Sequence, residues 1–211
     1  SGAGYPYIHA DQHAFTFLPG NSSTIFSGND GGVFKSTDGG TTWSDLSSGL
    51  AITQFYGVSG AQTNVNRIFA GAQDNGTDRV LNGSWTRVIG GDGMKALIDY
   101  SNENVGYGEL YNGAIQRTTN GGSSFTSISS GITGSGGWVT PYVINPLNPS
   151  SLYLGTTYVN KTLNKGTSWT AISSAYSTLV ALAVGRSDTN YIYAASSSDR
   201  KSTRLNSSHR T

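Results

Sequence analysis

The 211-residue chain has no cysteine, one methionine and five prolines, and charged residues make up only 12% of it. The absence of cysteine excludes disulfide bonds and thiolate zinc sites. No apolar run is long enough for a membrane-spanning helix, so we expect no membrane insertion. The 29 glycines, together with many serines, threonines and asparagines, favour short strands joined by tight turns.

One segment returns along the chain at a nearly constant interval. Its fullest form is Ser-Thr-Asp-Gly-Gly-Thr-Thr-Trp at residues 36–43. Residues 118–125 and 162–169 are close copies, and a remnant, Gly-Ser-Trp, stands at 83–85. The aromatic residues that close the four copies are 42, 40 and 44 residues apart. A steady period of this size is typical of a repeat architecture.

The residue types of this segment suit a tight turn between two strands. An Asp or Asn side chain at the third position accepts hydrogen bonds from the backbone N–H groups that follow, and the glycines allow positive φ angles. The closing aromatic residue begins the next strand and buries its ring. We therefore predict structural roles for Ser36, Asp38, Gly40, Trp43, Asn120, Gly122, Phe125, Asn164, Gly166 and Trp169.

The segment resembles the Asp-box, Ser-x-Asp-x-Gly-x-Thr-Trp, of the BNR-repeat β-propellers. This group includes sialidases, sortilin-like receptors, photosystem assembly factors and family 74 glycoside hydrolases, and similar propellers occur in secreted bacterial proteins. The resemblance implies an all-β propeller with four-stranded blades, in a ring of about seven. The chain would then hold about four and a half blades, at residues 9–48, 52–89, 94–130, 138–174 and 178–198, the last one truncated.

Each repeat also predicts four short strands from its own alternation and turn residues. In the fourth repeat these are residues 139–144, 151–155, 159–162 and 168–172. A linear β-solenoid usually has coils shorter than this period. No repeat shows the Gly-His start or the Trp-Asp end of a WD40 blade. The pattern therefore favours an Asp-box propeller.

The C-terminal segment is set apart from the repeats. Residues 199–209, Asp-Arg-Lys-Ser-Thr-Arg-Leu-Asn-Ser-Ser-His, resemble the translation of a common short-read sequencing adapter. We interpret residues 199–211 as a non-native tail and expect the natural protein to continue beyond Ser198. Without the tail, nine basic and eleven acidic side chains remain, so no basic face indicates a nucleic-acid partner.

The candidate functional residues fall on one face of the expected propeller. The box segments lie on one face, whereas the second-to-third turns and the fourth-to-first connections lie on the other, and loops on a rigid scaffold commonly carry function. We predict binding residues on this opposite face: His9, Asp11, His13, Gln73, Asp74, Asn75, Glu109 and Tyr111. Asp30 and Asp92 are the candidate catalytic carboxylates.

Three of these residues alternate along the sequence. On an extended strand the side chains of His9, Asp11 and His13 would lie on the same side. This spacing could hold a divalent metal ion, but we favour a hydrogen-bonded set of histidine and aspartate side chains. No cofactor is expected, although carboxylates on one face could bind calcium through their oxygen atoms.

Two classes of function fit this arrangement. The favoured one is an extracellular or cell-surface module that binds a polysaccharide or a protein. Its aromatic candidates, most of which we expect to pack between blades, are Tyr56, Tyr107, Tyr111, Trp138, Tyr142 and Tyr158. The alternative is hydrolysis of a β-glucan or xyloglucan-type polysaccharide by paired carboxylates.

The hydrolase alternative depends on the residues around Asp30. Asn-Asp-Gly-Gly-Val-Phe at residues 29–34 resembles the Asp-x-Gly-Gly-x-Tyr turn that carries a catalytic aspartate in family 74 enzymes, with the spacing shortened by one residue. Asp92 or Asp74 would be its partner. A sialidase is not favoured, because the arginines of the chain do not fit the triad that grips the substrate carboxylate in that family.

Overall fold

The computed structural model describes residues 8–50 and 53–198 and the backbone of residues 203–206. All regular structure in these residues is β-strand, which confirms the prediction of an all-β chain. They contain no helix that could cross a membrane. The chain divides into two compact units, Ser1–Gln54 and Phe55–Thr211, and each is described by itself. Residue 52, the expected start of the second repeat, lies outside the described residues.

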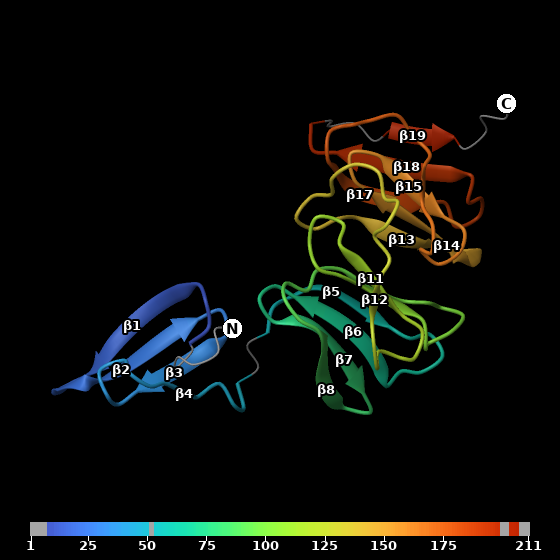
Figure 1. The fold of residues 1–211 in the computed structure, drawn as a ribbon. Coiled ribbons are helices and arrows are strands. Elements are labelled where there is room, and N and C mark those ends of the chain that lie inside the picture. The colour runs from blue at the N-terminus through green and yellow to red at the C-terminus, as the bar shows by residue number, and fades with distance from the viewer. Residues whose placement is uncertain (1–7, 51–52, 199–202, 207–211) are drawn as a thin grey trace. The chain divides into compact units, whose positions relative to one another are not determined.

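The first unit contains one sheet of four antiparallel strands in the order β1-β2-β3-β4. Its strands are β1 Gln12–Leu18, β2 Asn21–Asn29, β3 Gly32–Ser36 and β4 Ser44–Asp45. Asp30 and Gly31 alone join β2 to β3, so these strands form a tight hairpin. Strands that are consecutive in sequence are also neighbours in the sheet, which makes it a meander (Figure 1).

The second unit contains four more meanders, three of four strands and one of three. The second sheet has β5 Phe55–Gly60, β6 Arg67–Ala72, β7 Gly76–Leu81 and β8 Ser84–Ile89. The third has β9 Ala96–Ile98, β10 Gly106–Glu109, β11 Ile115–Thr118 and β12 Thr126–Ser127. The fourth has β13 Tyr142–Asn145, β14 Asn148–Gly155, β15 Val159–Thr162 and β16 Thr170–Ala171. The fifth has β17 Leu179–Val184, β18 Tyr191–Ser196 and β19 Thr203–Asn206.

The second sheet differs from the others at the turn before its last strand. Asn82 and Gly83 join β7 to β8 with φ angles of 51° and 79°. This is the conformation of a type I′ hairpin turn, for which Asn-Gly is a preferred sequence. The turn leaves the ring of Trp85 59% exposed and stacked on Phe55, with 5.7 Å between ring centroids. The prediction that every closing aromatic ring is buried is therefore wrong for Trp85.

The hydrophobic cores of the second unit lie between successive sheets. Phe69 and Ile98 belong to a cluster that joins the second and third sheets. The largest cluster joins the third and fourth sheets and contains Val105, Tyr107, Ile115, Ile128, Tyr142, Leu152, Leu154 and Trp169. A further cluster joins the fourth and fifth sheets and contains Tyr153, Val159, Leu179, Leu182, Ile192 and Ala194. The sheets therefore pack face to face in chain order.

The last strand, β19, lies within residues 199–211, the segment that we interpret from the sequence as a non-native tail. It pairs antiparallel with β18 from Tyr191↔Asn206 to Ala194↔Thr203. An open strand edge pairs readily with an extended segment of any origin. The pairing therefore does not bear on the origin of residues 199–211, of which 199–202 and 207–211 lie outside the described residues.

Candidate functional site

The meander order divides the turns between two faces. In each sheet, taken by itself, the first-to-second and third-to-fourth turns lie at one end of the strands, and we call this end the box-turn face of that unit. The second-to-third turns and the fourth-to-first connections lie at the other end, which is the opposite face. The three box turns are residues 36–43, 118–125 and 162–169.

In the first box turn one carboxylate organises the loop. Asp38 Oδ1 accepts hydrogen bonds from the backbone N–H of Thr42 and the hydroxyl of Ser36, both at 2.8 Å, and Asp38 Oδ2 accepts one from the Thr42 hydroxyl at 2.5 Å. The Thr42 hydroxyl and N–H are the main causes that lower the pKa of Asp38 to about 2. The carboxylate is thus engaged with its own turn.

The other two box turns repeat this arrangement with an amide in place of the carboxylate. Asn120 Oδ1 accepts hydrogen bonds from the Ser124 N–H at 3.0 Å and from the Thr118 hydroxyl at 2.9 Å. Asn164 Oδ1 accepts the equivalent hydrogen bonds from the Ser168 N–H and the Thr162 hydroxyl. The same geometry in three turns indicates a structural role.

The histidines and aspartates of the first unit are arranged differently from the expectation. Asp11 has a φ of 56°, and β1 begins only at the next residue. The chain bends there, so His9, Asp11 and His13 do not share one side of an extended strand. His13 Nε2 instead pairs with Asp30 Oδ1 of the same sheet. His9 packs against Gly31, where a Cβ would overlap the imidazole ring.

In the second unit, Asp92 braces a neighbouring turn. Its Oδ1 atom accepts a hydrogen bond of 2.9 Å from the Asp74 backbone N–H, and Tyr56 donates one of 2.7 Å to the side chain of Gln73. The residue after Asp92 is Gly93, where a Cβ would overlap the backbone of Gly76. Asp92, Gln73, Asp74 and Asn75 are thus brought together, whereas the other candidate carboxylate, Asp30, belongs to the first unit.

Glu109 is fully buried at the end of β10. Its Oε1 atom accepts a hydrogen bond of 2.7 Å from the Thr140 backbone N–H. Its buried Oε2 atom has no hydrogen-bond partner among the described residues. Burial raises the pKa of Glu109 to about 7, against an opposing effect of the Thr140 hydrogen bonds. The value suits an acid–base group, but the burial keeps the carboxyl from contact with a polymer.

Tyr111 and Trp138 form an exposed aromatic pair on the opposite face. Their rings stack with centroids 5.3 Å apart and an interplanar angle of 14°, and they are 41% and 44% exposed. The Asn112 N–H donates a hydrogen bond of 3.1 Å to the Gly137 carbonyl, which joins the two loops that carry the pair. Of the other aromatic candidates, Tyr107 and Tyr142 are fully buried, Tyr158 is partly buried and Tyr56 is exposed.

Several solved structures are similar to this chain. An ancestral GH74 enzyme aligns with 97% of this chain and 32% of its own, at 18% identity and a TM-score of 0.55. The GH74 enzyme of Niastella koreensis aligns with 94% of this chain and 31% of its own, at 21% identity and a TM-score of 0.55. The β-propeller domain of Cps50 from Myceliophteria thermophila aligns with 88% of this chain and 62% of its own, at 12% identity and a TM-score of 0.51. The fold is that of a β-propeller.

Identities this low show the fold alone, and each four-stranded meander is a propeller blade. The chain spans about a third of the length of the two GH74 enzymes. No protein-family model and no curated protein sequence matches it.

The sequence interpretation missed a set of braces between blades. Arg79 on β7 donates a hydrogen bond of 3.3 Å to the carbonyl of Gly121, in the box turn of the next blade. Arg117 on β11 likewise donates one of 2.7 Å to the carbonyl of Lys165, in the box turn of the blade after it. The sequence does contain a pattern that indicates these contacts. A basic residue occupies the equivalent third-strand position in the four repeats: Lys35, Arg79, Arg117 and Lys161.

Proposed function

We propose that this propeller is an extracellular or cell-surface binding module whose ligand lies on the opposite face. The observation that carries the proposal is the stacked pair of Tyr111 and Trp138, which presents two aromatic rings to solvent. Large exposed aromatic rings are typical of binding surfaces. A carbohydrate is the ligand class we favour, because an exposed ring offers an apolar face to the C–H groups of a sugar.

The surroundings of the pair support a preformed site. The loops of Tyr111 and Trp138 are joined by the hydrogen bond between Asn112 and Gly137. The Thr140 hydroxyl donates a further one of 2.9 Å to the same Gly137 carbonyl. Rings held in place before binding lose little conformational entropy when a ligand arrives. The buried Glu109 holds the Thr140 N–H in turn and so supports the site without touching the ligand.

Hydrolysis by Asp30 and Asp92 remains the alternative, and the fold shared with two GH74 enzymes favours it. Glycoside hydrolysis needs one carboxyl as acid and a second as base or nucleophile. Each candidate is already engaged, Asp30 with His13 and Asp92 with the Asp74 N–H. The binding function therefore has the stronger support.

The test compares glycan binding of the wild type with that of Tyr111→Ala and Trp138→Ala on an array of plant and bacterial polysaccharides. We expect each variant to lose about ten-fold or more in affinity, as for the aromatic anchor of an interface. Tyr193→Ala is the control, because Tyr193 is 43% exposed on β18, outside the proposed site. Equal affinities in all four proteins would refute the proposal.

Reducing-sugar release from β-glucan and xyloglucan separates the two functions. Release that is abolished by Asp30→Asn or Asp92→Asn, with folding unchanged, would establish the hydrolase instead. A lack of glycan binding, together with a protein ligand whose binding depends on Tyr111, would replace the carbohydrate by a protein on the same surface.

A further inference from the structure

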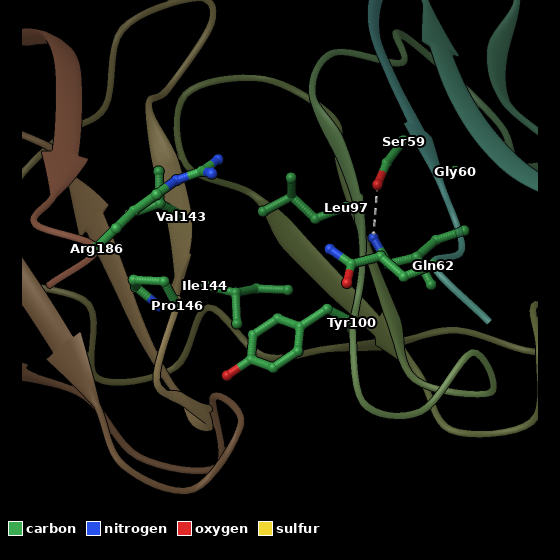
Figure 2. Close-up of a pocket in the computed structure, with 10 residues that line it drawn as sticks. Ser59, Gly60, Gln62, Leu97, Tyr100, Val143, Ile144, Pro146 and Arg186 are labelled. Carbon is green, nitrogen blue, oxygen red and sulfur yellow. Dashed lines mark hydrogen bonds between the residues drawn. The ribbon is translucent and has the colours of Figure 1, made fainter.

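A second site lies on the box-turn face, away from the proposed ligand surface. A cavity of about 540 Å³ opens where the first strands of the four blades in the second unit end. Its lining residues are Ser59, Gly60, Gln62, Leu97, Ile98, Tyr100, Val143, Ile144, Pro146 and Arg186. Figure 2 shows Arg186 on one wall and Ser59, Gly60 and Gln62 on the wall across from it.

Half of the ten lining residues offer aliphatic surface. Leu97, Ile98, Val143, Ile144 and Pro146 supply aliphatic groups. The hydroxyl groups of Ser59 and Tyr100 already form hydrogen bonds within the protein. The Ser59 hydroxyl accepts a hydrogen bond of 3.0 Å from the Ile98 N–H (Figure 2), and the Tyr100 hydroxyl donates one of 3.1 Å to the Asn145 carbonyl.

Two polar side chains of the lining differ from the rest. Arg186 and Gln62 are both exposed, and neither forms a hydrogen bond or an ion pair with the described part of the chain. The acidic residue nearest to Arg186 in sequence, Asp188, instead accepts a hydrogen bond of 2.9 Å from the Asn190 N–H. Arg186 is the one charged residue among the ten that line the cavity, so the site favours an anion.

We propose that this cavity binds a carboxylate that carries an apolar group, with Arg186 and Gln62 as donors to the carboxylate. A guanidinium group matches a carboxylate with two parallel N–H donors, which a point charge cannot do. The aliphatic side chains of the lining then receive the apolar group of the ligand. A volume of about 540 Å³ lies within the range of known small-molecule sites.

A carboxylate with an apolar group occurs both in a free small acid and at the C-terminal residue of a peptide. The experiment is calorimetric titration of the full chain with N-acetyl-leucine and with its uncharged counterpart, N-acetyl-leucinamide. A pentapeptide that ends in leucine, with a free or an amidated C-terminus, forms the second pair of probes. We expect the free acids to bind about ten-fold or more tightly than the amides, because a charge-assisted hydrogen bond is lost in the amides.

Variants assign the binding to the cavity. Arg186→Gln should weaken binding of the free acids to the level of the amides, and Gln62→Leu should weaken it less. Arg87→Gln is the matched control, because Arg87 is an exposed arginine of the same unit on β8, outside the cavity. Tighter binding of the peptide acid than of N-acetyl-leucine would identify a peptide terminus, and equal binding a small acid.

Three results would each overturn the proposal. The first is equal affinity for acid and amide. The second is an equal effect of Arg186→Gln and Arg87→Gln, which would indicate unspecific attraction of anions. The third is no heat of binding for any probe at about 10 mM, a concentration that detects affinities well into the millimolar range.

Discussion

The Oε1 atom of Glu109 lies 2.7 Å from the backbone nitrogen of Thr140 and accepts its hydrogen bond. This contact ties the end of β10 to the segment before β13, so it joins two blades. The second oxygen of Glu109 is buried without a hydrogen-bond partner in the described chain. A carboxyl in such a place favours its protonated form, because the charged form would be poorly solvated.

The first prediction follows from this carboxyl. Unfolded glutamate loses its proton near pH 4.5, whereas native Glu109 keeps it to about pH 7. The native state therefore binds more protons in this window, and stability should fall by up to about 3 kcal/mol as the pH rises from 4.5 to above 7. Glu109→Gln should reduce this fall, which urea unfolding at a series of pH values measures.

Glu103→Gln is the control for this experiment, because Glu103 is a partly exposed carboxyl of the same blade. It should keep the pH dependence of the wild type. Lys95 is a charged neighbour of Glu109: burial lowers the pKa of Lys95, and the charge of Glu109 opposes this effect. An unchanged slope in Glu109→Gln would show that another group causes the dependence.

The second prediction concerns the box turn at residues 118–125. Asn120→Ala removes the acceptor of the Thr118 and Ser124 hydrogen bonds and should cost about 1 to 2 kcal/mol of stability. Asn120→Asp should cost much less, because Asp38 has the same role in the first box turn. Thermal unfolding of the three proteins measures this. No loss in Asn120→Ala would show that the side-chain hydrogen bonds do not stabilise the turn, and equal losses in both variants would show that Asp cannot replace Asn here.

The third prediction uses a pair of neighbouring glycines. A Cβ at Gly93 would overlap backbone atoms of Gly76 and Ala72, whereas a Cβ at Gly90 would meet no atom within 4 Å. Gly93→Ala should therefore destabilise the protein by about 1 to 3 kcal/mol. Gly90→Ala should stay within about 0.5 kcal/mol of the wild type. Chemical denaturation followed by tryptophan fluorescence tests both, and a neutral Gly93→Ala would contradict the close approach.

The fourth prediction concerns the brace between the third and fourth blades. Arg117→Met removes the hydrogen bond to the Lys165 carbonyl and should cost about 1 to 3 kcal/mol, because the donor is charged. Arg87→Met removes an exposed arginine and should change stability by less than about 0.5 kcal/mol. Trp169 lies at the braced interface, so its fluorescence reports the opening. Equal changes in stability for the two substitutions would show that the hydrogen bond of Arg117 does not stabilise the interface between the blades.

Much of the fold could be predicted from short-range sequence patterns. The strand expected at residues 159–162 is β15, and the one expected at 151–155 lies within β14. Strand alternation and turn residues act over a few positions, so one sequence is enough to see them. The box turns are equally local, since all the hydrogen bonds of Asn164 are made within residues 162–168.

The features that sequence reasoning missed depend on residues far apart in the chain. Arg117 and Lys165 are 48 positions apart, and their contact exists only after two blades have packed. Tyr107 is buried and Tyr111 is exposed, because Tyr107 lies on β10 between two packed sheets whereas Tyr111 lies in the loop that follows this strand. The bend at Asp11 required a positive φ that nothing in the local composition indicates.

The arginine braces all point the same way along the chain. Arg79 reaches forward to Gly121, and Arg117 reaches forward to Lys165, so the second and third blades each hold the box turn of the next blade. Stability in such an array is a sum of terms from single repeats and from nearest-neighbour interfaces. A lost brace therefore weakens one junction and leaves the others intact. The second unit should therefore unfold in steps, beginning at the least stable interface between two blades.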